Sequence, residues 1–377
     1  MENNLDVIRK SVGAETKVMG VIKADAYGHG YFEVARCLSE SGIDYLGVAE
    51  TTEALFLRGK GISTPIMVLS YYCGDDIESL IDNDITITVF DMESAVKISS
   101  LAKDNNKTAK VHIKIDTGMS RLGFMFDDSG DVREGTIADI AQIRSLPNLY
   151  IEGIYSHFAC SDDADDSFTR LQYSRFTALI NALGKMNITF DIKHICNSGA
   201  ILKYKDMHLD MVRAGLCLYG HLPSGDIENP GLLPVMGINS VIADVKNIKA
   251  GDTVSYARKF TAGSDMKIAV VPIGYADGFK RILSGKISML VNGNVCPQIG
   301  LICMDQCMID VSHVKNIKIN DKVVIIGEDY GNNITVEEIA KCADTINYEI
   351  ICAIGRRVPR VYIHRNSLFK VVSYLSD

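Results

Sequence analysis

The sequence predicts an α/β protein with two parts: a TIM-type (β/α)8 barrel over residues 1–228 and a mainly antiparallel β domain over residues 229–377. Three observations lead to this prediction. Short apolar runs alternate with amphipathic ones from Lys17 to Gly220, and about eight strand–helix units of this kind close into a parallel barrel. Prolines and glycines crowd between residues 221 and 234, which marks a linker. Beyond the linker, apolar residues repeat with a period of two, which is typical of strands.

The barrel part contains strand candidates separated by helical patterns. Parallel strands buried on both faces appear as short continuous apolar runs, and helices show a period near 3.6. The expected strands are Val18–Ala24, Tyr45–Val48, Ile66–Leu69, Ile85–Val89, Val111–Ile115, Ile151–His157, Ile192–Cys196 and Met211–Tyr219. The expected helices are Tyr31–Ser41, Thr52–Arg58, Asp76–Ile81, Met92–Lys103 and Leu171–Leu183. Chemistry on such a barrel is expected at the carboxyl ends of the strands.

The second part shows hairpin signals and one helix signal. Residues Ile287–Val291 alternate in polarity and return through Asn292-Gly293, a dipeptide that favours a tight hairpin turn. Thr335 and Glu338 have the spacing of a capping box, which predicts one late helix.

Composition excludes several classes of function. The formal net charge of −8 argues against a broad nucleic-acid surface, because binding phosphates needs clustered lysine and arginine. No apolar run approaches the ~18 residues that span a bilayer, and the polar start does not resemble a signal peptide. The ten cysteines are scattered, mostly within apolar segments, which favours free thiols in a cytoplasmic protein. Cys303 and Cys307 are the only cysteines close together in the sequence, and no second pair of cysteines or histidines completes a set of four ligands, so no structural metal is expected.

Lys23 closes the first expected strand and is the strongest candidate for chemistry. Because the run before it is apolar, we expect the lysine to enter a closed site, where burial lowers the pKa of an amine. A neutral amine can form a Schiff base with an aldehyde cofactor. A single lysine at a strand end is more often a solvated strand end, so other motifs have to decide.

The segment Val21–Gly30 resembles the cofactor-lysine motif of the alanine racemase family, whose members use pyridoxal 5'-phosphate. Pyridoxal phosphate homeostasis proteins and decarboxylases with a similar barrel share this kind of segment. The resemblance to the racemases continues from Leu5 to the C-terminus, with further motifs in the same order. It implies an amino-acid racemase that interconverts L-alanine and D-alanine for peptidoglycan, or alternatively a serine or broad-specificity racemase.

The resemblance implies a set of cofactor contacts: Lys23, Tyr27, His157, Asn197, Ser198, Arg213, Gly215, Leu216 and Arg356. Arg213 would face the pyridine nitrogen. Because a guanidinium keeps its proton, that nitrogen would accept a hydrogen bond and stay unprotonated. A ring in this state is a weaker electron sink, which suits a racemase, whereas the decarboxylases use a carboxylate at this position.

The resemblance also implies the substrate side of the site. Racemisation needs proton exchange on both faces of Cα, so Lys23 on one face requires an opposing base, which would be Tyr256. Arg121 suits the substrate carboxylate because its guanidinium is forked, and Lys114 would be carbamylated to give Arg121 an anionic neighbour. The implied substrate-binding residues are Arg121, Tyr275, Cys303, Met304 and Asp305. In the family, Tyr256, Tyr275, Met304 and Asp305 belong to the second subunit of a head-to-tail homodimer.

Arg356 departs from the family pattern, since many members carry tyrosine at this position. We expect the substitution to widen or re-polarise the pocket and to permit some turnover of serine. A non-catalytic pyridoxal phosphate-binding protein is the alternative from another class, but such proteins resemble the barrel alone and lack a β domain that presents Tyr256.

Overall fold

The computed structural model describes residues 1–364 and 367–375. It contains two compact units. Unit 1 comprises Met1–Ala26 and Tyr31–Leu233, and unit 2 comprises Tyr27–Gly30 and the chain from Pro234 onward. The sequence analysis placed the boundary between residues 228 and 229, and the chain passes between the units at Leu233 and Pro234.

Unit 1 is a closed barrel of parallel strands, as predicted. Its strands follow the order β4-β3-β2-β1-β9-β8-β7-β5, and the pairing of β4 with β5 closes the ring. A short β6 pairs with the end of β5. The bounds are β1 (Lys17–Val21), β2 (Tyr45–Val48), β3 (Ile66–Val68), β4 (Ile85–Val89), β5 (Ala109–Asp116), β6 (Phe124–Met125), β7 (Leu149–Tyr155), β8 (Ile192–His194) and β9 (Met211–Ala214).

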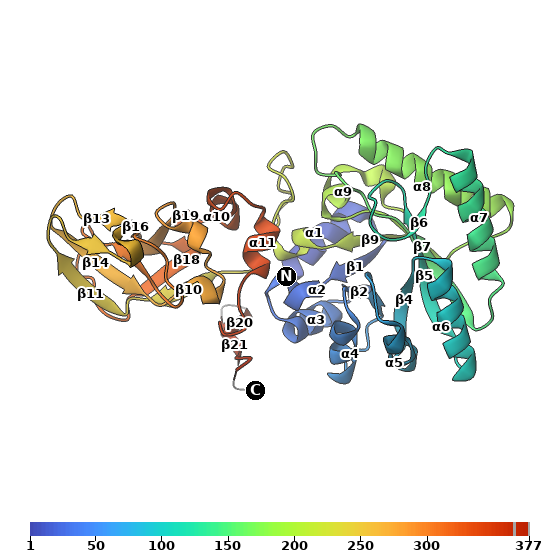
Figure 1. Cartoon of the computed structure of the whole chain (residues 1–377), viewed down its shortest axis with the longest axis horizontal. Coiled ribbons are helices and arrows are strands. Elements are labelled where there is room, and N and C mark those ends of the chain that lie inside the picture. The colour runs from blue at the N-terminus through green and yellow to red at the C-terminus, as the bar shows by residue number, and fades with distance from the viewer. Residues whose placement is uncertain (365–366, 376–377) are drawn as a thin grey trace. The chain divides into compact units, whose positions relative to one another are not determined.

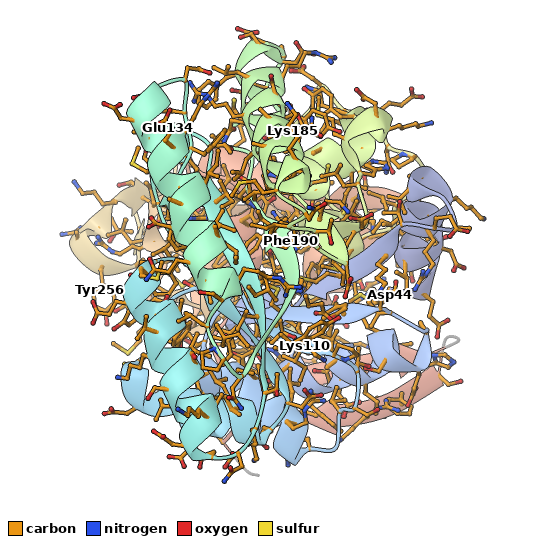
Figure 2. All side chains as sticks on the ribbon, turned by 90° about the vertical axis from the view of Figure 1, so that its right-hand side faces the viewer. Asp44, Lys110, Glu134, Lys185, Phe190 and Tyr256 are labelled. Atoms are coloured by element: carbon orange, nitrogen blue, oxygen red, sulfur yellow. The ribbon has the colours of Figure 1, made fainter. Side chains whose placement is uncertain are left out.

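Helices cover the outside of the barrel strands (Figure 1). In Figure 2, Glu134 marks α7 and Lys185 marks the end of α8, two members of this outer layer. The bounds are α1 (Glu2–Val12), α3 (Tyr31–Glu40), α4 (Thr51–Gly59), α5 (Ile77–Asp82), α6 (Met92–Asp104), α7 (Gly130–Arg144), α8 (Ser167–Lys185) and α9 (Ser198–Lys203). The segment labelled α2 (Lys23–Tyr27) is a turn with left-handed φ and ψ, not a regular helix.

Unit 1 differs from the sequence prediction in some of its helices and in several strand bounds; for example, the predicted strand Val18–Ala24 is β1 (Lys17–Val21). Helices α1, α7 and α9 were not predicted; α7 buries only Thr136, Ile140 and Ile143, so its apolar stripe is thin. The predicted strand Met211–Tyr219 is too long, because Leu216–Tyr219 forms a 3-10 turn. All four residues of that turn are buried, and hydrophobicity alone does not separate a buried turn from a buried strand.

The barrel interior combines apolar packing with buried polar groups. Strands β2, β3 and β4 are buried at every position, as expected for strands covered on both faces. An apolar cluster in the core consists of Met19, Tyr45, Met67, Tyr155, Ile192 and Met211. Beside it, the side chains of His112, His194 and Arg213 are also buried.

Unit 2 is built mainly from antiparallel strands, as predicted. Its larger sheet has the order β10-β18-β15-β16-β17-β14-β11. The predicted hairpin is confirmed by the antiparallel pairing of β15 with β16 across Asn292-Gly293. The strand bounds are β10 (Ile238–Val241), β11 (Asp244–Ile248), β12 (Thr253–Val254), β13 (Phe260–Thr261), β14 (Met266–Val271), β15 (Ser288–Val291), β16 (Asn294–Ile299), β17 (Cys307–Asp310), β18 (Lys322–Asp329), β19 (Asn332–Ile334), β20 (Arg360–His364) and β21 (Ser367–Val372).

Two short helices follow the sheet strands of unit 2, α10 (Val336–Cys342) and α11 (Asn347–Cys352). The predicted capping box is confirmed, because Thr335 and Glu338 exchange side-chain to backbone hydrogen bonds of 3.1 Å and 2.8 Å at the start of α10. All ten cysteines are free. Among the described residues, no helix has the length and apolarity needed to span a bilayer, and no three His, Cys, Asp or Glu side chains group as metal ligands would.

Candidate active site

Lys23 begins a turn of unusual backbone conformation at the carboxyl end of β1. Ala24, Asp25 and Ala26 all have positive φ, with values of 54°, 55° and 51°. Each such non-glycine residue costs roughly 1–2 kcal/mol, so the surrounding structure must hold the turn. Oε1 of Glu53 accepts the N–H of Ala24 at 2.8 Å, and Oδ1 of Asp25 accepts the N–H of Tyr31 at 3.0 Å. Glu53 thus stabilises the turn that presents Lys23.

The prediction that Lys23 lies in an enclosed site is wrong for the single chain, because its side chain is exposed. Lys23 lies two residues beyond Val21, the last residue of β1 that pairs with β2. The local sequence shows that a strand ends in a lysine. It does not show what covers the end of the barrel.

Arg213 lies in the barrel interior, with 4% of its surface exposed. Its Nη1 donates to Nδ1 of His194 at 2.8 Å. Its Nη2 donates to Nδ1 of His157 at 2.9 Å. The carbonyl oxygens of Ser156 and Ile195 also accept from Nη2, at 2.8 Å and 3.0 Å. Burial lowers the pKa of Arg213 to about 10, so it is still a cation at neutral pH. The described residues offer no acceptor to its Nε–H, which leaves a strong donor for a ligand atom.

His157 is neutral and surrounded by cations. Burial holds its pKa well below the usual range, and the nearby charges of Arg213, Arg121, Lys114 and Lys23 lower it further. Since Nδ1 of His157 accepts from Arg213, its proton resides on Nε2. Four positive groups around one imidazole give this end of the barrel a potential that attracts anions.

A tight turn after β5 carries Arg121. Oδ1 of Asp116 accepts the N–H groups of Gly118, Met119 and Ser120 at 2.8–3.0 Å, and its Oδ2 accepts the N–H of Arg121 at 2.7 Å. Burial alone would raise the pKa of Asp116, but these four donors lower it overall. The ionised carboxylate therefore fixes the backbone from which the exposed Arg121 side chain projects.

Lys114 is buried beneath this turn, with 6% of its surface exposed. Its Nζ lies 5.3 Å from the centre of the Tyr155 ring, and a small hollow beside it is also lined by Met119, Arg121 and His157. Burial lowers the pKa of Lys114 to about 7, helped by the positive charges of Arg121 and Arg213. About half of these amines are therefore neutral at pH 7.

The start of α9 and the turn after β9 lie against each other. The hydroxyl oxygen of Ser198 accepts the N–H groups of Gly215 and Cys217 at 3.1 Å and 3.3 Å. Asn197 caps α9 by accepting the N–H of Ala200 at 3.1 Å. The predicted phosphate-binding residues Asn197, Ser198, Gly215 and Leu216 are therefore neighbours in space.

Several N–H groups in this region have no acceptor among the described residues, namely those of Ser198, Gly199 and Leu216. Orphan backbone donors at a helix start form a natural cradle for an anion such as phosphate. A Cβ at Gly199 would lie 2.8 Å from Oγ of Ser161, so any larger residue there would have to displace the Ser161 side chain. The N–H of Gly215, one of the cofactor contacts implied by the family resemblance, donates to Oγ of Ser198 in this structure.

Unit 2 gathers the other predicted residues. Tyr256, labelled in Figure 2, is 70% exposed and follows Ser255, whose Oγ lies 3.5 Å from Sγ of Cys303. The N–H of Tyr275 donates to the carbonyl of Cys303 at 3.1 Å, and Met304 is the next residue and half exposed. Four of the predicted residues thus form one surface, which we call the tyrosine surface: Tyr256, Tyr275, Cys303 and Met304.

Two arginines of unit 2 behave differently. Arg357 pairs with Asp305 at 2.7 Å and with Asp277 at 2.6 Å, so Asp305 holds an arginine beside the tyrosine surface. Arg356 is exposed, and no hydrogen bond or ion pair joins its side chain to the described residues. Its neighbour Arg357, which the sequence analysis did not single out, makes these ion pairs.

Sequence reasoning also missed His112, His194 and Glu152, which lie behind Arg213. One signal was available: Lys110, His112, Lys114 and Asp116 alternate with apolar residues along one strand, and therefore share one face. No local signal pointed to Glu53 or to the left-handed turn that it supports.

Comparison with known proteins identifies the family. The model for the N-terminal domain of alanine racemase matches residues 1–223, and the model for its C-terminal domain matches residues 235–362. The chain belongs to the alanine racemase family. Its activity is alanine racemisation, and its cofactor is pyridoxal 5'-phosphate.

Individual racemases resemble this chain along almost its whole length. Alanine racemase 2 of Caldanaerobacter subterraneus subsp. tengcongensis is 42% identical over 374 residues, which is 99% of this chain and 95% of that one. A solved alanine racemase of Clostridium difficile 630 has a TM-score of 0.93 at 41% identity and covers 99% of this chain and 96% of its own. The Bacillus anthracis racemase with bound L-Ala-P has a TM-score of 0.91 at 34% identity, covering 99% and 95%.

The residues present fit pyridoxal phosphate. Open N–H groups at Ser198, Gly199 and Leu216 suit a phosphate, and the Nε–H of Arg213 suits the ring nitrogen. The cationic surroundings of His157 suit both the phosphate and a substrate carboxylate.

Proposed function

We propose that the chain racemises alanine by a two-base proton exchange, in which Lys23 serves one face of Cα and Tyr256 of the partner subunit serves the other. A single acid/base group reaches only one face, so racemisation calls for two. Lys23 at the barrel end and Tyr256 on the tyrosine surface are both exposed, which is what a shared site requires of each. The proposal therefore includes a homodimer.

When bound, pyridoxal phosphate supplies an electron-withdrawing ring that acidifies the C–H bond of the substrate. Lys23 and the hydroxyl of Tyr27 would hold its aldehyde carbon and its phosphate. Asn197, Ser198, Gly215 and Leu216 shape the anion cradle. His157 would lie against the ring.

The observation that carries the proposal is the setting of Arg213. Every acceptor that it contacts is neutral, and burial leaves its guanidinium protonated. At the ring nitrogen, Arg213 would be a permanent donor and would keep that nitrogen unprotonated, which would limit how far negative charge moves into the ring and so disfavour side reactions. A decarboxylase with this kind of barrel would present a carboxylate there.

Arg121 would bind the substrate carboxylate, and a carbamylated Lys114 would supply it with an anionic partner. Tyr275, Cys303, Met304 and Asp305 would bound the substrate, and Arg356 would lie near the cofactor in place of the usual tyrosine. Alanine is the substrate that all of these features accommodate, with serine as a secondary one. We further propose that the enzyme acts in the cytoplasm and supplies D-alanine for peptidoglycan.

An assay of the purified holoenzyme on a panel of L-amino acids tests the assignment. We expect L-alanine to have the highest kcat/KM, L-serine a measurable one, and larger side chains almost none. Lys23→Ala should abolish racemisation and remove the borohydride-reducible covalent link to the cofactor. A reducible adduct on another lysine, or a preference for a larger amino acid, would contradict the assignment.

A further inference from the structure

Polar side chains, four of them buried and that of Glu152 partly buried, form a continuous chain through unit 1. The hydroxyl of Tyr45 donates to Oε2 of Glu152 at 2.7 Å, and Nε2 of His112 lies 2.9 Å from the same oxygen. Nδ1 of His112 lies 2.9 Å from Nε2 of His194, whose Nδ1 accepts from Arg213 at 2.8 Å. We call these five residues the buried relay. It extends from the first residue of β2 to the ends of β8 and β9.

The two ends of the buried relay determine every proton position in it. A guanidinium only donates and a carboxylate only accepts. Arg213 therefore donates to Nδ1 of His194, which places the proton of His194 on Nε2, where it is donated to His112. The proton of His112 must then be on its own Nε2, where Glu152 accepts it. Both imidazoles are neutral, in agreement with the pKa of each being lowered by burial.

The buried relay also separates a cation from its counter-charge. Burial would raise the pKa of Glu152, but the hydrogen bonds from His112 and Tyr45 lower it overall, so Glu152 is ionised. A buried arginine commonly forms a direct ion pair with a carboxylate. The carboxylate that the hydrogen bonds link to Arg213 is instead two imidazoles away. A carboxylate beside the ring nitrogen would favour its protonation, whereas a remote one offsets the charge of Arg213 without this effect.

The strands around the buried relay are shaped to hold it. His112 on β5 pairs with Gly153 on β7, and a Cβ at Gly153 would lie 2.5 Å from both Nδ1 and Cε1 of the imidazole. The ring of Tyr155 stacks on that of His194 with 4.8 Å between centroids and 7° between planes. Both imidazoles are fully buried.

We propose that Glu152 is a positioning residue for Arg213: through His112 and His194 it sets which imidazole nitrogens accept, and so keeps Nδ1 of His194 open to the guanidinium. The consequence for catalysis rests on the proposed place of Arg213 at the ring nitrogen. The tautomers of the two imidazoles do not depend on whether Arg213 contacts the ring nitrogen. The positioning role of Glu152 and the proposed role of Arg213 can therefore be refuted separately.

Histidine 15N NMR of the wild-type holoenzyme is the first test. We expect both His112 and His194 to be neutral with the proton on Nε2 throughout the range from about pH 6 to pH 8. An imidazolium, or a proton on Nδ1 of either residue, would overturn the proposal, whatever the variants do.

The second test compares Glu152→Leu with Glu152→Gln. Glutamine keeps an accepting oxygen, so the tautomers should persist. In Glu152→Leu, Nε2 of His112 loses the carboxylate that accepts its proton, and the freed hydroxyl of Tyr45 can donate to that nitrogen instead. We expect a fraction of the molecules to have both tautomers inverted, which directs an N–H of His194 at the guanidinium of Arg213. We expect kcat for alanine racemisation to fall roughly tenfold in Glu152→Leu, with a smaller change in KM.

Asp191→Asn is the matched control, because Asp191 accepts from Tyr150 at an exposed position beside the same strands. It should leave kcat and both tautomers unchanged. Unchanged tautomers in a folded Glu152→Leu enzyme, or an equal loss of kcat in the control, would refute the positioning role. If Glu152→Leu does not fold, Glu152→Met takes its place, with the same expected change of tautomers and the same outcome that would refute the role. If the tautomers are as expected but Arg213→Glu leaves transamination unchanged, the proposed role of Arg213 fails and the relay stands.

Discussion

Lys114 should react selectively with carbon dioxide. Carbamate formation requires a neutral amine, and the pKa of Lys114 is lowered from 10.5 to about 7 by burial and by the neighbouring guanidinium groups. At pH 7 about half of the Lys114 amines are neutral, against roughly one in three thousand for an ordinary lysine. Lys114 therefore has a far larger fraction of the reactive neutral amine than an exposed lysine, before any stabilisation of the product anion by Arg121 is counted.

The assay is 13C NMR of the enzyme equilibrated with 13C-bicarbonate. We expect one carbamate signal for each chain near pH 8, its loss in Lys114→Met, and weaker labelling below about pH 6, where the amine is protonated. The KM for alanine should rise about tenfold in Lys114→Met because Arg121 loses an anionic neighbour. Lys110→Met, on the same strand but with a partly exposed side chain, is the control and should keep the signal. A signal that survives in Lys114→Met, or no signal in the wild type, would refute the reasoning.

Three further outcomes follow from the site geometry. Arg213→Glu should raise the rate of pyruvate formation relative to racemisation, and an unchanged ratio in a folded variant would contradict the role of Arg213. Asp116→Ala should lower the free energy of unfolding by about 3 kcal/mol at pH 7, because four backbone N–H groups lose a charged acceptor. The pKa of Asp116 is lower in the folded state than in the unfolded state, so this difference in unfolding free energy is fully present above the unfolded-state pKa and is lost as pH falls through the folded-state pKa. Thermal melts of the wild type and of Asp116→Ala at neutral and at acid pH check the sign. Arg356→Tyr should raise the alanine-to-serine ratio of kcat/KM, and an unchanged ratio would show that Arg356 does not set selectivity.

The barrel could be predicted because buried parallel strands appear in the sequence as short apolar runs. The predicted bounds of Tyr45–Val48 and Ile85–Val89 agree with β2 and β4. Arg213 stood out as a charge on an apolar strand, and it is buried as that position implies. These properties depend on residues close together in the sequence.

Other features depend on residues far apart and could not be predicted. His112 and His194 are 82 positions apart, so their hydrogen bond has no local signature. The left-handed turn after Lys23 contains no glycine before Gly28. It is stabilised by two hydrogen bonds: Glu53 accepts the N–H of Ala24, and Asp25 accepts the N–H of Tyr31. Lys23 is exposed in the single chain, and whether the end of the barrel is covered likewise depends on residues far from Lys23 in the sequence.

The shared two-base site is the central claim, and subunit mixing tests it most directly. Inactive Lys23→Ala chains and inactive Tyr256→Phe chains are combined under conditions that exchange subunits, with exchange verified by tagged chains. Random exchange makes about half of the dimers mixed, and each mixed dimer has one site with both residues intact. We predict that racemisation recovers to about a quarter of the wild-type rate. No recovery after verified exchange would show that Lys23 and Tyr256 of one chain serve the same site, which would contradict the account.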